Sequence, residues 1–178
     1  MSGMTAEQAV FALNTFFLDT LKKEGATTKK ILAAVPADQA DYRPDANAKS
    51  ARELLRHIAT ADNFFIEAVL NGVFNPAATQ IPETVKTPAE VAEWYEKRHA
   101  ANLESLAKLP GEQLTKIVDF RGMFELPAIM FLQFGLVHAI HHRGQLSTYL
   151  RPMGAKVPAI YGESYDSAQA KKAAQGTS

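Results

Sequence analysis

Four long segments of this chain place apolar residues at helical spacing, and each lies between recognisable start and stop signals. Three of them open with a capping box, in which threonine or serine is followed three residues later by glutamine or glutamate: Thr5 to Gln8, Ser50 to Glu53 and Thr87 to Glu90. The fourth opens at Pro127 and ends before Gly154. Helices with one apolar face must pack that face against one another, so the pattern predicts an all-α four-helix bundle.

The connections between these segments predict short additional elements. The first long helix is expected to end at Gly25, and residues 27–35 then predict a short helix. Residues 114–124 alternate enough to allow a short extended segment. We expect a single domain over residues 1–166, followed by a frayed or weakly helical tail over residues 167–178 that is rich in small and polar residues.

The composition restricts which partners and compartments fit the chain. Its 178 residues are 47% hydrophobic and 21% charged, which is ordinary for one globular domain with a sizeable core. The formal net charge is zero and no dense basic run occurs, so binding of nucleic acid is not expected. No apolar run is long enough to span a bilayer, and the N-terminus lacks a basic region followed by an apolar stretch. We therefore expect a cytoplasmic protein without a membrane partner.

The chain has no cysteine, and this limits the chemistry of any site. Disulfides, thiolate ligands and a cysteine nucleophile are excluded, which leaves histidine, carboxylate and water as metal ligands. Any thiol that takes part in a reaction must therefore come from outside the chain.

Three histidines fall within one and a half turns of the fourth helix. His138 and His142 lie one turn apart and project from one face, with His141 beside them. They share a predicted inward stripe with apolar and polar neighbours: Phe131, Phe134, Gln145 and Tyr149. Several buried imidazoles would repel one another if protonated, so a neutral cluster around a cation is a reasonable arrangement.

A third candidate ligand, His57, lies on the apolar face of the second helix. If the two helices are neighbours, His57 and the pair His138 and His142 could hold one ion and leave a position open for water or substrate. The alternative for His57 is a core histidine with a satisfied hydrogen bond. Spacing alone also lets His141 replace or assist His142, and His99 is expected at the surface or at the edge of an apolar face.

Two further residues on the fourth helix could serve the same site. Gln145 and Tyr149 lie one and two turns beyond His142, where they could orient a metal-bound water or a substrate. In the alternative, Tyr149 packs within the bundle and Gln145 bonds to a helix end. Arg143 points about 140° away from His138 and is expected to be a packing, dimer or helix-end residue.

These motifs carry a resemblance to a known family. Residues 136–162, which include His138, the run His141-His142-Arg143-Gly144-Gln145 and Tyr161-Gly162, closely resemble the C-terminal signature of the DinB family. Residues 53–58 resemble that family's first metal-binding segment. The resemblance covers nearly the whole chain and implies an up-down-down-up four-helix bundle, usually a homodimer, with a divalent metal held by three histidines.

The positions that match the family's triad are His57, His138 and His142, so the choice of His142 over His141 comes from the resemblance. Wide apolar faces at Phe16 and Phe17 and over residues 131–136 also favour a homodimer, because one four-helix core cannot bury them all.

The function expected from these features is that of a metal-dependent enzyme acting on a small molecule. An ion on three histidines can act as a Lewis acid, lower the pKa of a bound water or bind a thiolate. Related families include transferases and isomerases that use low-molecular-weight thiols, which implies a thiol-dependent transferase or a hydrolase with one zinc, nickel or iron ion per chain. The alternatives are a non-catalytic stress-response protein with a structural ion, and a small-molecule binder whose histidine cluster is empty.

Overall fold

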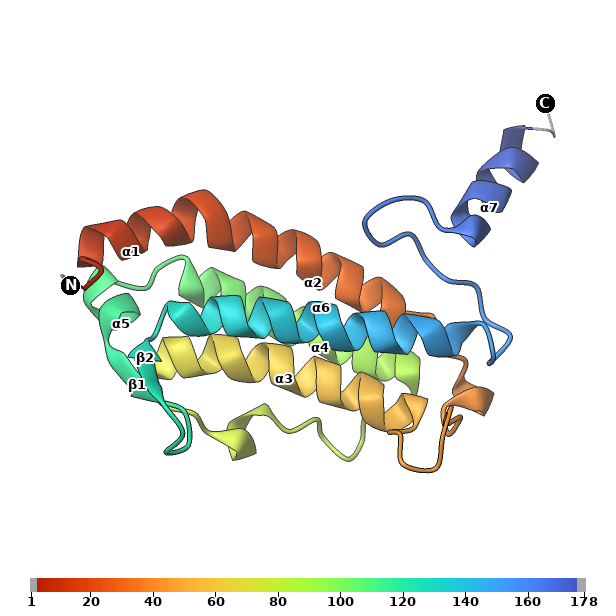
Figure 1. The fold of residues 1–178 in the computed structure, drawn as a ribbon, viewed down its shortest axis with the longest axis horizontal. Coiled ribbons are helices and arrows are strands. Elements are labelled where there is room, and N and C mark those ends of the chain that lie inside the picture. The colour runs from red at the N-terminus through yellow and green to blue at the C-terminus, as the bar shows by residue number, and fades with distance from the viewer. Residues whose placement is uncertain (1–2, 176–178) are drawn as a thin grey trace.

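The computed structural model describes residues 3–175, and its core is a bundle of four long helices. The first consists of α1 (Ala6–Ala12), a π-helical turn η1 (Leu13–Phe17) and α2 (Leu18–Ala33). The other three are α3 (Ala51–Asn71), α4 (Pro88–Leu106) and α6 (Met130–Leu150). In Figure 1 the first helix and α6 run in one direction, while α3 and α4 run in the other. The predicted all-α, up-down-down-up bundle is therefore confirmed.

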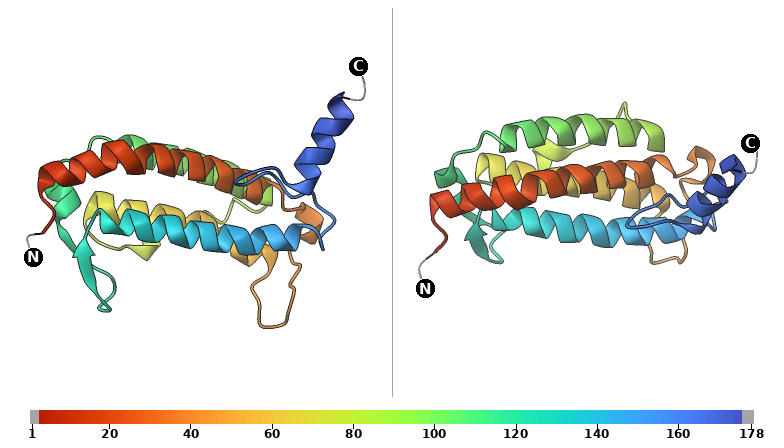
Figure 2. Two further views of the ribbon diagram at one scale, coloured as in Figure 1. Left: turned by 45° about the horizontal axis from the view of Figure 1, so that its top comes forward. Right: turned by 90° about the horizontal axis from the view of Figure 1, so that it is seen from above.

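Each long helix packs against two neighbours. α3 contacts α4 and α6, and α2 contacts the same two helices from the other side, as the turned views of Figure 2 show. Buried apolar side chains form one cluster around Leu54 and Leu146 and a second around Ile66 and Leu132. The two clusters fill the interior between the α3–α6 pair and the α2–α4 pair.

The predicted start signals are present as hydrogen-bonded caps. At α3 the Ser50 hydroxyl accepts a hydrogen bond from the Glu53 amide, and the Glu53 carboxylate accepts one from the Ser50 amide. Reciprocal caps of the same kind open α1 and α4. Gly72, with φ of 68°, ends α3 in the left-handed conformation that glycine adopts most easily.

The predicted end of the first helix at Gly25 is wrong. α2 continues to Ala33 without interruption, and Gly25 lies buried in its middle. A Cβ at this position would lie 2.5 Å from Cε1 of His99 on α4. The glycine therefore permits a close contact between two helices and does not end one.

Smaller elements close the ends of the bundle. The predicted extended segment is present as β1 (Ile117–Asp119), which pairs antiparallel with β2 (Glu125–Pro127) after the short helix α5 (Gly111–Thr115). Because Pro127 is the last residue of β2, α6 begins three residues later than predicted, at Met130. Two short 3-10 turns, η2 (Ala37–Gln39) and η3 (Pro76–Thr79), lie in the connections on either side of α3.

The C-terminal segment forms a further helix, α7 (Tyr165–Gln175), which extends away from the bundle and has no buried residue (Figure 1). The last three residues of the expected tail lie outside the described part of the chain, and the domain boundary at residue 166 stays a prediction. No helix within residues 3–175 is long and apolar enough to cross a lipid bilayer.

Candidate metal centre

Three histidines from two helices meet where α3 packs against α6. Nε2 of His57 lies 3.1 Å from Nε2 of His138, although the two residues are 81 positions apart in the chain. The ring of His142 lies 4.6 Å from that of His57 and 4.4 Å from that of His138, between ring centroids. Each residue offers one nitrogen, and the three nitrogens lie within 4.8 Å of one another. The structure thus brings together the three histidines that match the family's triad, and this group could hold a metal ion.

The burial of the three rings differs from the sequence expectation. They are half-buried at the border of the core, and Phe134, expected on the same inward stripe, is 44% exposed. Phe131 is buried as predicted, while the rest of the inner face of α6 consists of residues outside that stripe: Leu132, Gly135, Leu136, Ala139, Arg143, Leu146 and Leu150. Because α6 carries apolar side chains on nearly all sides, its periodicity could not decide which stripe faces the core. Because the three histidines lie at the edge of the α3–α6 contact, two packed helices hold them while one side of the cluster stays accessible to solvent.

The environment keeps the three imidazoles neutral. Burial, followed by the neighbouring histidines, lowers the pKa of His138 to about 4. Burial is also the main cause that lowers the pKa of His57 and of His142 from the usual value for histidine. A neutral imidazole carries the lone pair that a metal ion requires, so protons compete weakly for this cluster near neutral pH.

Gln145 fixes the orientation of one ring. Its side-chain oxygen lies 2.7 Å from Nδ1 of His142 and can accept a hydrogen bond from the Nδ1–H group. Nε2 of His142 is then the nitrogen with a free lone pair. His138 lacks such support, because its Nδ1 is buried without a hydrogen-bond partner.

The two remaining candidates on α6 lie differently. His141 is exposed, and its ring contacts that of His142 with 4.8 Å between centroids, outside the three-nitrogen group. The hydroxyl of Tyr149 donates a hydrogen bond to the Lys49 carbonyl at 3.3 Å, and its ring packs edge-on against Tyr42. Tyr149 therefore packs within the bundle, as in the alternative to a role at the site. His141 borders the cluster from the solvent side.

A buried polar network that the sequence did not predict lies between α3 and α4. His99, expected near the surface, is 5% exposed, and Asp62 beside it is 4% exposed. Asp62 accepts a hydrogen bond from the Tyr95 hydroxyl, and burial raises the pKa of Tyr95. One turn further along, Arg98 binds Glu67 with two hydrogen bonds of 2.6 and 2.9 Å. The i, i+4 spacing of Tyr95 and His99 could have indicated that His99 is buried, since it places both residues on one face of α4.

Comparison with known proteins agrees with this fold. The chain matches the model of the DinB family over residues 9–175. It is 30% identical over 129 residues to YjoA, an uncharacterized protein of Bacillus subtilis, which covers 71% of this chain and 82% of YjoA. The crystal structure of that DinB-like protein superimposes with a TM-score of 0.69 at 26% identity, over 83% of this chain and 99% of the other. A DinB-like protein from Bacillus cereus gives a TM-score of 0.67 at 25% identity, over 82% and 95% of the two chains. On the family match and the fold together, this chain belongs to the DinB family.

Proposed function

We propose that the protein binds one divalent metal ion per chain through His57, His138 and His142 and uses it to act on a small molecule. The observation that carries the proposal is the convergence of three imidazole nitrogens, within 4.8 Å of one another, from two packed helices. Zinc, nickel and iron all accept imidazole ligands, so the donor set fits each of them.

The bound ion would supply Lewis acidity, by which it lowers the pKa of a water molecule or binds a thiolate. The chain itself would provide three neutral rings held by α3 and α6, and Gln145 would keep His142 in the tautomer that presents Nε2. The exposed His141 next to His142 would be available to exchange a proton with a molecule at the cluster.

Two reaction classes fit these residues: transfer of a group to an external low-molecular-weight thiol, and hydrolysis of a small molecule. The thiol must be external because the chain has no cysteine. The competing function is that of a non-catalytic stress-response protein with a structural ion. Structural zinc sites have four protein ligands, whereas among residues 3–175 no further histidine, aspartate or glutamate joins the three. Three ligands favour an open, reactive site.

Elemental analysis of protein purified without an affinity tag tests the metal site. We expect about one divalent ion per chain, and His142→Ala should remove most of it. His141→Ala is the matched control, because it removes a neighbouring exposed imidazole and should leave the metal content nearly unchanged. Wild-type protein without metal, or a loss of metal in His141→Ala alone, would overturn the assignment of ligands.

A second measurement separates the enzyme from the structural alternative. In protein loaded with cobalt(II), a small thiol such as 2-mercaptoethanol should change the visible absorption spectrum by binding at an exchangeable position. A spectrum that no added thiol or anion alters would indicate a closed structural site.

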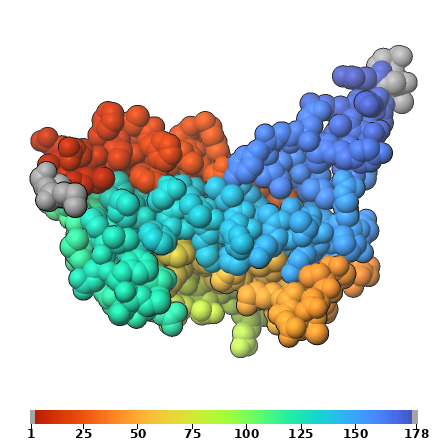
Figure 3. Space-filling view, in the orientation of Figure 1, coloured from red at the N-terminus to blue at the C-terminus, as the bar shows by residue number. Residues whose placement is uncertain are grey.

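We further propose that the protein is a cytoplasmic homodimer without nucleic-acid or membrane partners. The outer surface of α6 lies open across the face shown in Figure 3 and carries three exposed apolar side chains: Phe134, Val137 and Ile140, of which 44%, 55% and 39% are exposed. A second copy would bury this surface. Light scattering at micromolar concentration should give twice the mass of one chain, and Val137→Lys should give a monomer. A monomeric wild type would refute the assembly.

A further inference from the structure

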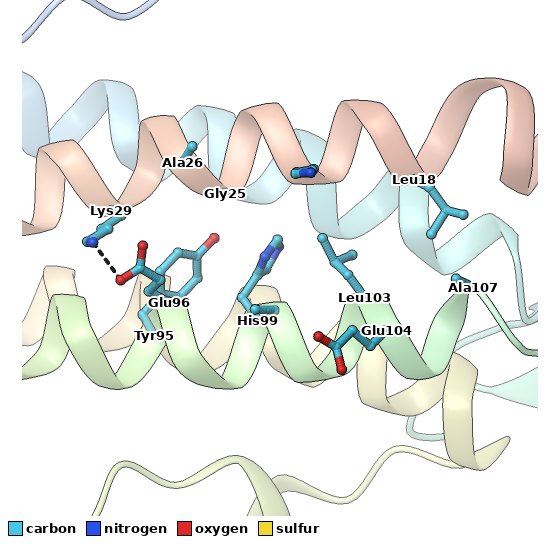
Figure 4. A pocket seen from close by; sticks show the side chains of 12 residues that line it. Leu18, Gly25, Ala26, Lys29, Tyr95, Glu96, His99, Leu103, Glu104 and Ala107 are labelled. Atoms are coloured by element: carbon cyan, nitrogen blue, oxygen red, sulfur yellow. Dashed lines mark hydrogen bonds and ion pairs between the residues drawn. The ribbon is translucent and has the colours of Figure 1, made fainter.

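A cavity of about 520 Å³ lies between α2 and α4 (Figure 4). The histidine cluster lies between α3 and α6, on the opposite side of the bundle. Several residues of the cavity lining, among them Lys22, Ala100 and Glu104, are exposed, so the cavity is open to solvent and a small molecule can enter it. Sites for small molecules have volumes of roughly 300–1,000 Å³, and the volume of this cavity lies within that range.

A buried histidine without a hydrogen bond lines this cavity. His99 lines the cavity, and its Nε2 is buried with no partner, 3.7 Å from the Asp62 carboxylate. That carboxylate already accepts a hydrogen bond from Tyr95. Since a carboxylate can only accept, a neutral His99 would direct the Nε2–H group toward Asp62 and keep the lone pair on Nδ1. The ring would then offer one acceptor at the α2 side, where it meets Gly25.

The walls of the cavity are apolar and its rim is electrically balanced. Small side chains, Ala26 on α2 and Ala100 on α4, leave space between the two helices. Leu18 and Leu103 line one half of the cavity (Figure 4). The other half is bounded by an ion pair between Lys29 and Glu96 at 2.5 Å. Lys22 and Glu104 complete the charged lining, so two positive charges face two negative ones. A cavity of this kind gives no net attraction for a charged ligand.

We propose that this cavity is a second binding site, independent of the histidine cluster, for an uncharged and mainly apolar small molecule that carries one N–H or O–H donor. The apolar part of the ligand lies between α2 and α4, and its donor bonds to His99. Asp62 acts as a positioning residue, because its carboxylate lies 3.7 Å from Nε2 of His99, and Tyr95 holds that carboxylate by a hydrogen bond.

Binding of N-phenyl-1-naphthylamine, an uncharged fluorescent aryl amine with one N–H group, tests the site. We expect saturable binding of one molecule per chain. Ala100→Phe should weaken it at least tenfold, because the phenyl ring fills the cavity. Ala101→Phe is the matched control: it adds the same ring at the next, exposed position of α4, outside the cavity lining, and should leave the affinity unchanged. No saturable binding, or equal affinity in the two variants, would overturn the proposal.

The role of His99 has its own test. His99→Phe keeps a ring and removes both nitrogens, so it should weaken binding of the amine about three- to tenfold more than binding of 1-phenylnaphthalene, which lacks the donor. Equal losses for both compounds would refute the hydrogen bond to His99. Binding should persist in His57→Ala and in the presence of EDTA, which separates this site from the metal centre. Loss of binding in His57→Ala would place the probe at the histidine cluster and contradict a second site.

Discussion

The guanidinium group of Arg143 on α6 lies 2.5 Å from the carboxylate of Glu24 on α2, and the Arg143 side chain is only 1% exposed. The same guanidinium donates hydrogen bonds to the Glu24 carbonyl, to Thr28 and to Tyr161. Tyr161 in turn donates a hydrogen bond to Glu24 at 2.9 Å. Because Arg143 directly follows His142, this ion pair fixes the rotation of α6 at the candidate metal centre and ties the C-terminal segment to the bundle.

Replacement of Glu24 should strongly destabilise the fold. Glu24→Gln leaves the buried Arg143 charge without a counter-ion, and we expect the free energy of unfolding to fall by about 3–5 kcal/mol in urea denaturation. Asp19→Asn is the control, since Asp19 and its partner Lys23 are 66% and 74% exposed and such pairs contribute about 0–1 kcal/mol. Equal losses in the two variants would show that the burial of Arg143 has no energetic role.

Gly25 in α2 and Gly144 in α6 should respond to alanine in opposite directions. Gly25→Ala would place a Cβ 2.5 Å from His99, and we expect a loss of about 1–3 kcal/mol in spite of the better helix propensity of alanine. Gly144→Ala meets no atom within 4 Å, so it should stabilise α6 by about 0.5–1 kcal/mol. Thermal and urea denaturation measure both, and a stabilised Gly25→Ala protein would contradict the observed contact.

The stability of the metal-free protein should fall as the pH is lowered. The pKa of His138 is about 4 in the folded protein and about 6.5 when unfolded, so the unfolded state takes up the proton first. The contribution of His138 is fully present above about pH 6.5 and is lost progressively toward pH 4. Because the His138 ring is half-exposed, we expect the free energy of unfolding to fall by about 1–2 kcal/mol over this pH range. Urea denaturation in EDTA at several pH values measures it, and His138→Gln should flatten the profile.

Gln145 should control metal affinity without being a ligand. Gln145→Ala removes the acceptor that lies 2.7 Å from Nδ1 of His142, and loss of such a support lowers metal affinity roughly ten- to a hundredfold. The effect should be visible at limiting metal and disappear at saturation. Gln133→Ala, at an exposed position on the same helix, is the control. Unchanged affinity in Gln145→Ala would mean that the ring of His142 needs no support from this amide.

Much of the fold was readable from local chemistry. The caps at Ser50 and Thr87 were predicted because a hydroxyl and a carboxylate three residues apart satisfy the free amides of a helix start wherever that helix lies. The spacing of His138 and His142 likewise fixed their common direction, because a helix sets the angle between residues four apart. The absence of cysteine removed whole classes of site without any structural information.

Tertiary structure decided what depends on a partner helix. The sequence could not show that His57 and His138 would meet at 3.1 Å, since that distance depends on which helices are neighbours. The predictions for Gly25 and His99 were wrong for the same reason. The ring of His99 packs against Gly25, and the two residues are 74 positions apart in the chain. The sequence by itself therefore determined the four long helices, the capped starts of three of them and the candidate ligands, through interactions within a few residues. Only packing decided which faces turned inward, because burial is a property of two surfaces in contact.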